Sequence, residues 1–103
     1  MEAPAITAES LVDWLRTQPG ETTYDAGFGD RCLLTNWLRG VGLDVQRTEV
    51  AVPQPAWIDR ETGEKHRAPE LWTLFCRVAV SEPHTFSAAL SRAEAFIARR
   101  EAA

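Results

Sequence analysis

The segment that follows Thr85 carries the clearest structural pattern in the sequence. Its apolar residues recur at the spacing of one helix face, and its charged residues lie off that face. Thr85 can serve as the N-cap, and Arg99 and Arg100 suit the negative end of a helix dipole. We expect a helix over 85–100 that buries its apolar stripe against a sheet. The stripe consists of Phe86, Ala89, Leu90, Ala93, Phe96 and Ile97.

Two shorter helices are expected near the start of the chain. The first begins at Thr7 and ends at residues 18–20, where Pro and Gly stop it. The second begins at Asp30, whose carboxylate suits an N-cap. An acidic loop over 20–30 joins them, with Tyr24 and Phe28 as its anchors in the core. The apolar stripes are Leu11, Trp14 and Leu15 in the first helix and Leu33, Leu34, Trp37 and Leu38 in the second.

The middle of the chain has the character of β-structure. We predict a strand over 43–52, ended by Pro53 and Pro55, and a hairpin over 57–67 with Gly63 in its turn. Residues 71–80 are apolar on both faces, which favours a central strand containing Trp72 and Cys76. The sequence therefore predicts one α+β domain over 1–103, of two layers. A three- to four-stranded antiparallel sheet packs against helices in the order α-α-β-β-β-α.

Composition excludes several classes of function. The net charge is -4, so we expect no direct nucleic-acid binding. An apolar fraction of 45% supports a core that needs no metal, disulfide or cofactor. The first residues lack the basic and apolar pattern of a secretory signal, and no apolar run reaches the roughly 18–20 residues of a membrane span. We expect a cytoplasmic protein that does not enter membranes.

Cys32 is the single residue that most suggests chemistry. We place it in the first helical turn, where the dipole can lower a thiol pKa, and about 160° from the apolar face. The run from Gly29 to Leu34, followed by a helix ending in Gly-x-Gly, resembles the nucleophile helix of papain-like and cell-wall-peptidase cysteine hydrolases. That resemblance implies His66 as a partner for the thiol. The alternative is a Cys that packs at the helix start. His66 and His84 lack ligand-spaced partners, so no metal site is expected.

A second resemblance covers roughly residues 8–43. Tyr24-Asp25, then Cys32-Leu33-Leu34, Trp37-Leu38-Arg39 and Gly42 are similar to a pattern in small uncharacterised proteins of phages and prophages. The resemblance implies a small accessory protein. Proteins of this size and acidity in that setting often bind and block a host component, as anti-CRISPR inhibitors do.

These observations favour a small non-enzymatic protein-binding module, in the form of a phage-type inhibitor of a host system. We expect its partner to be a protein. The alternatives are a small cysteine hydrolase or transferase using Cys32, and a structural subunit of a homo-oligomer, of which a homodimer is the simplest form. The predicted binding residues lie on the hairpin, where a tryptophan is next to charged side chains. They are Trp57, Arg60, Lys65, His66 and Arg67, and the competing site is the acidic loop from Glu21 to Asp30.

Overall fold

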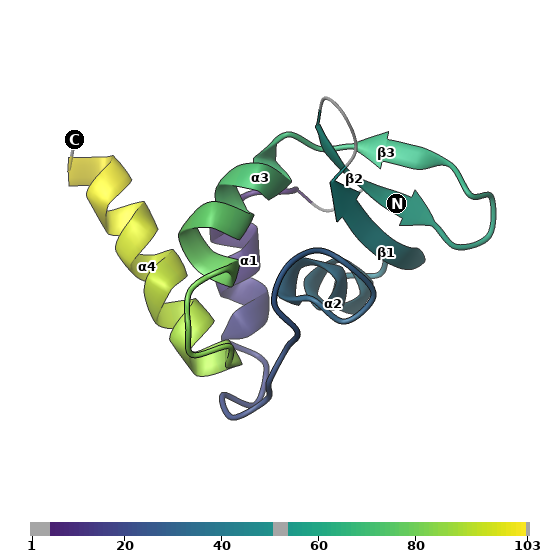
Figure 1. The fold of residues 1–103 in the computed structure, drawn as a ribbon. Coiled ribbons are helices and arrows are strands. Elements are labelled where there is room, and N and C mark those ends of the chain that lie inside the picture. The colour runs from purple at the N-terminus through teal and green to yellow at the C-terminus, as the bar shows by residue number, and fades with distance from the viewer. Residues whose placement is uncertain (1–4, 51–53, 103) are drawn as a thin grey trace.

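The computed structural model describes residues 5–50 and 54–102. Helices α1 (Ala8–Leu15) and α2 (Leu33–Gly40) precede strands β1 (Val45–Val50), β2 (Pro55–Asp59) and β3 (Lys65–Arg67). Helix α3 (Glu70–Leu74), the π-helix η1 (Phe75–Ala79) and the long helix α4 (Phe86–Ala102) follow (Figure 1). The strands form one antiparallel sheet in the order β1-β2-β3. The predicted α+β class and its order of elements are confirmed. Residues 51–53, where we predicted the end of the first strand, lie outside the described residues.

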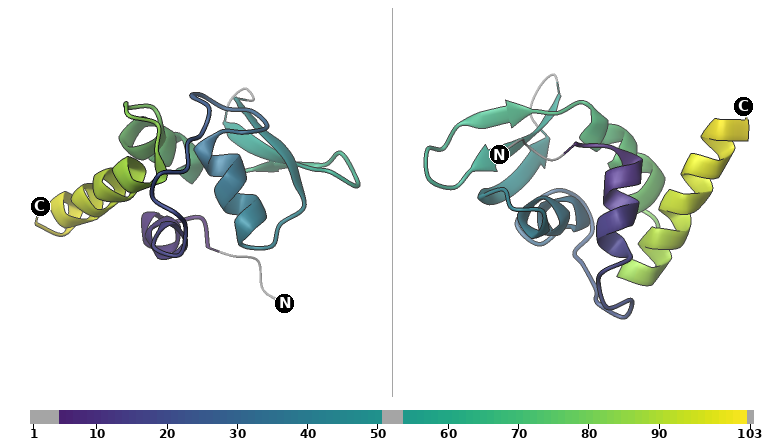
Figure 2. Two further views of the ribbon diagram at one scale, coloured as in Figure 1. Left: turned by 90° about the horizontal axis from the view of Figure 1, so that it is seen from below. Right: turned by 180° about the vertical axis from the view of Figure 1, so that it is seen from behind.

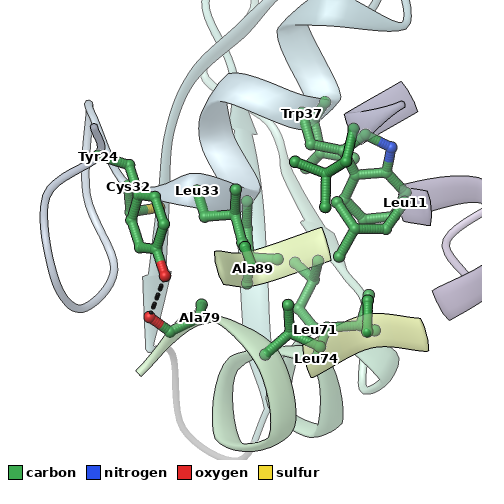
Figure 3. Packing of buried hydrophobic residues seen from close by; sticks show 14 of the residues in the cluster. Leu11, Tyr24, Cys32, Leu33, Trp37, Leu71, Leu74, Ala79 and Ala89 are labelled. Atoms are coloured by element: carbon green, nitrogen blue, oxygen red, sulfur yellow. Dashed lines mark hydrogen bonds between the residues drawn. The ribbon is translucent and has the colours of Figure 1, made fainter. Parts of the chain in front are cut away.

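The sheet lies at one end of the molecule and the helices α1, α3 and α4 gather at the other (Figures 1 and 2). Helix α2 connects the two parts because it packs against β1 on one side and against α1 and η1 on the other. Its apolar stripe is completely buried, and Leu11 of α1 and Leu71 of α3 complete the centre of the core (Figure 3). The stripe comprises Leu33, Leu34, Trp37 and Leu38, as predicted.

Hydroxyl caps begin two of the helices as the sequence predicts. The Ser10 N–H donates to Thr7 Oγ1 at 3.1 Å in α1, and the Ala88 N–H donates to Thr85 Oγ1 at 3.3 Å in α4. Each bond satisfies an amide that the first turn leaves without a helical partner. Asp30 does not cap α2, because Cys32 takes that position.

Helix α4 packs against α1 and η1, so the prediction that its stripe covers the sheet is wrong. Arg92 fixes the position of α4 beside η1: its Nε donates to the Val78 carbonyl at 2.7 Å and its Nη2 to the Tyr24 hydroxyl at 2.9 Å. Tyr24 in turn donates to the Ala79 carbonyl at 2.7 Å (Figure 3). The two side chains thereby donate hydrogen bonds to carbonyls at the end of η1, where no following helical turn supplies N–H groups to donate to them.

The predicted strand over 71–80 is also wrong, because this segment forms α3 and η1. An apolar run on both faces fits a buried strand and a helix equally well. In the helix, Leu71, Leu74 and Val78 enter the core, while Trp72 and Cys76 are exposed instead of buried. The bond from the Val80 N–H to the Phe75 carbonyl, 3.0 Å long, shows the five-residue spacing of a π-helix.

The hairpin between β2 and β3 confirms the predicted turn. Gly63 has φ of +73°, a conformation that glycine adopts without steric cost. The Asp59 carboxylate accepts the Glu61 and Thr62 N–H groups, both at 2.9 Å. These bonds hold the pKa of the Asp59 carboxyl below its usual value. In the strands, Trp57 stands opposite His66 and Ile58 opposite Lys65.

Candidate protein-interaction site

Cys32 is buried, with 1% of its surface exposed. As the N-cap of α2 it accepts the Thr35 N–H at 3.4 Å, and its Sγ lies 3.3 Å from Thr35 Oγ1 and 3.1 Å from Thr48 Oγ1. The prediction that it points away from the core is therefore wrong. Its φ of -74° and ψ of 167° are extended, so the 100° rotation per residue of a helix does not apply to it.

A catalytic thiol needs a base within hydrogen-bond reach. His66, the predicted partner, lies on β3 and its ring stacks on Trp57. His84 precedes α4, and its Nε2 lies 3.1 Å from the Val80 carbonyl oxygen. In the described ranges, the hydrogen-bond partners of the Cys32 thiol are threonine hydroxyls, a backbone amide and the Gly29 carbonyl. This environment gives the thiol a role in holding α2 to β1 and to the loop that precedes α2.

The predicted hairpin site contains one tight aromatic contact. The Trp57 and His66 rings stack with centroids 4.1 Å apart and planes inclined by 12°. Trp57 is partly buried against the core, so only part of its ring is available to a partner. The stack thus joins two of the predicted residues into one rigid cross-strand pair.

The charged hairpin residues make ion pairs within the chain. Arg60 Nε lies 3.2 Å from Asp44 Oδ1, and Lys65 Nζ lies 2.8 Å from Glu49 Oε1. The bond from Lys65 holds the pKa of the Glu49 carboxyl below its usual value. Arg67 lies at the other end of β3, opposite Ala56. A partner that binds here would have to compete with these exposed pairs, each of which is weak.

The acidic loop is held by a similar pair. Arg39 donates to the Asp30 carboxylate, and this bond lowers the pKa of the Asp30 carboxyl. The Asp25 N–H donates to the Arg31 carbonyl at 3.0 Å, which closes the loop on itself. A polar hollow of about 400 Å³ lies within the loop, between Asp25 and Cys32. Asp25 and Asp30 both line it, so the competing site is also accessible to a partner.

Three aromatic rings form a further surface feature, which we call the aromatic stack: Phe28, Phe75 and Trp72. The Phe28 and Phe75 centroids are 4.6 Å apart, and those of Phe75 and Trp72 are 5.7 Å apart, with both ring pairs inclined by 25°. Trp72 is 50% exposed. Sequence reasoning missed this feature because it assigned Trp72 to a buried strand. The i, i+3, i+7 spacing of Leu71, Leu74 and Val78 was the signal for a helix that turns Trp72 outward.

Two other types of site are absent from residues 5–50 and 54–102. No group of three His, Cys, Asp or Glu side chains there is arranged to hold a metal ion. No helix there combines the length and the apolar character that crossing a membrane requires.

Comparisons with protein-family models, curated proteins and solved structures returned no match for this chain. The arrangement of its own residues is therefore the basis for a functional proposal.

Proposed function

We propose that this protein is a small non-enzymatic protein-binding module and that the aromatic stack is its main contact surface. The observation that carries the proposal is the half-exposed Trp72 ring, which stacks on Phe75 and through it on Phe28. Tryptophan is enriched among the residues that dominate binding energy at protein interfaces. An inhibitor of a host system is the finer form of the proposal, supported by the sequence resemblance of residues 8–43 alone.

Preorganisation supports this surface over the charged hairpin. Phe75 is part of a helical segment whose end is held by Tyr24 and Arg92, and its ring is clamped between two others. A ring that is already fixed loses little conformational freedom on binding. By contrast, Arg60 and Lys65 must give up ion pairs with Asp44 and Glu49 before they can bind a partner.

The test compares three forms of the protein in affinity capture from lysate, followed by affinity measurement with the captured partner. Trp72→Ala removes the exposed ring of the aromatic stack, and Trp57→Ala with Arg60→Ala alters the hairpin. We expect Trp72→Ala to weaken binding by at least about 2 kcal/mol, or roughly thirtyfold in Kd. The double hairpin variant should have a smaller effect. Circular dichroism checks that each variant keeps the wild-type fold.

Three results would count against the proposal. If the hairpin variant loses the partner and Trp72→Ala keeps it, the contact surface is the hairpin. If the wild-type protein captures no protein, it is not a binding module of this kind. If the wild type is a stable dimer that Trp72→Ala converts to monomer in sedimentation, the aromatic stack joins copies of this chain, and the homo-oligomer alternative is correct.

A further inference from the structure

Two adjacent hollows lie where α1, α3 and η1 meet the C-terminal half of α4. The first, of about 200 Å³, has Ile6, Leu74 and Phe96 in its walls. The second, of about 320 Å³, is lined by Arg77, Phe96, Arg99 and Arg100. Phe96 and Arg100 belong to both, so the hollows share a wall. Figure 2 shows the last turns of α4 extending beyond α1.

The second hollow concentrates positive charge in an acidic protein. Its walls hold three guanidinium groups and no carboxylate, although the chain has a net charge of -4. Arg77 and Arg99 are exposed, and neither guanidinium group makes a hydrogen bond or ion pair with the residues that the structure describes. Arg100 pairs with Glu9 and lies over the Phe96 ring, 5.6 Å from its centroid. Two arginines are therefore available to an anionic ligand.

The first hollow offers a different surface beside these charges. Its apolar walls can take a hydrophobic side chain. Two carboxylates, those of Glu9 and Glu70, also line this hollow. Glu9 is already paired with Arg100. A ligand that fills both hollows would thus combine a hydrophobic side chain with negative charge next to it.

We propose that the two hollows bind an acidic segment of a partner protein. Its carboxylates pair with Arg77 and Arg99, whose planar guanidinium groups match carboxylate geometry. An adjacent apolar side chain of the segment packs beside Phe96. A nucleic acid fits less well, because it needs many phosphate contacts and the remaining surface of this acidic chain repels it. This proposal rests on the protein-binding function above and assigns it a second contact surface.

The probe is a fluorescein-labelled peptide of sequence DEELFDEE, and its binding is followed by fluorescence anisotropy at low ionic strength. The neutral peptide NQQLFNQQ measures the contribution of the carboxylates, and a labelled single-stranded oligothymidylate measures general affinity for polyanions. The site variant is Arg77→Ala with Arg99→Ala. The matched control is Arg31→Ala with Arg47→Ala, which removes two exposed positive charges from elsewhere in the chain. Circular dichroism checks that both double variants are folded.

We expect the acidic peptide to bind at least tenfold more tightly than the neutral one, and the site variant to lose at least tenfold in affinity. The control variant should change the affinity by less than threefold. Equal losses in the two double variants would show an effect of net charge and overturn the site. Tighter binding of the oligothymidylate than of the acidic peptide would overturn the choice of a protein ligand. If Trp72→Ala abolishes capture of a partner but the site variant does not, the protein-binding function stands and this second surface is wrong.

Discussion

Thr35→Val should destabilise the fold, although the two side chains have nearly the same volume. Thr35 is completely buried at the junction of α2, β1 and the preceding loop. Its hydroxyl donates to the Gly29 carbonyl and accepts the Thr48 N–H at 3.1 Å. It also lies 3.0 Å from Thr48 Oγ1 and 3.3 Å from Cys32 Sγ. A methyl group in its place can make none of these bonds.

The size of the effect follows from which partners remain. The Thr48 N–H keeps a second acceptor, the Gly29 carbonyl at 3.2 Å, and Thr48 Oγ1 keeps Cys32 Sγ at 3.1 Å. No buried group is therefore left wholly without a partner. Two lost hydrogen bonds at about 0.5–1.5 kcal/mol each predict a loss of about 1–3 kcal/mol.

Urea unfolding followed by tryptophan fluorescence measures this loss. For an m-value of about 1 kcal/mol/M, the midpoint should fall by about 1–3 M. Thr73→Val is the control, because Thr73 is exposed on α3 and its variant should stay within about 0.5 kcal/mol of the wild type. A Thr35→Val protein as stable as this control would show that the buried hydroxyl cluster does not hold the junction together.

Three further outcomes are expected. Gly40→Ala should destabilise the protein by about 1–3 kcal/mol in urea unfolding, because the new Cβ would lie 2.2 Å from Trp14 Nε1. Helix propensity alone predicts a gain in stability for this substitution, and such a gain would contradict the close packing of Trp14 on Gly40. Burial raises the pKa of Tyr24 although the charge of Arg92 opposes it, so the folded state holds this proton more tightly than the unfolded state. Stability should then fall as the pH rises above about 10, and Tyr24→Phe should reduce that slope; an unchanged slope in urea unfolding between pH 9 and 11 would refute the assignment. Leu90→Ala should cost about 1–2 kcal/mol, less than for a fully buried leucine, because Leu90 is only partly buried against the core; a thermal midpoint equal to that of the wild type would show that the contact contributes nothing.

The sequence predicts α4 well because its signals agree. Thr85 caps it, and its apolar residues fall on one face only, so strand and helix patterns are distinguishable. The segment 71–80 lacks that contrast. Its exposed Trp72 and Cys76 are apolar, and the Tyr24 and Arg92 bonds that complete η1 come from distant parts of the chain. Those long-range bonds have no local signature in the sequence.

The candidate sites also differ in how far the sequence predicts them. The sequence predicts the hairpin and the glycine in its turn, whereas the pairing of Trp57 with His66 comes from the strand register that the structure shows. With Asp30 as the expected N-cap, Cys32 is expected two residues inside the helix, but it is the N-cap itself, and that two-residue shift changes its side chain from exposed to buried. The aromatic stack could not be predicted, because Phe28 and Phe75 are 47 positions apart and meet only after the loop folds over η1.

Site-specific photocrosslinking tests the binding proposal most directly. A photoreactive phenylalanine analogue at position 72 places the reactive group at the aromatic stack, and the same analogue at position 91 places it on the exposed face of α4 as a control. In lysate, position 72 should give a discrete adduct with a second protein, and position 91 should give none. Adducts of equal yield from both positions, or an adduct from a probe at position 60 on the hairpin and none from position 72, would contradict the assignment of the aromatic stack as the contact surface.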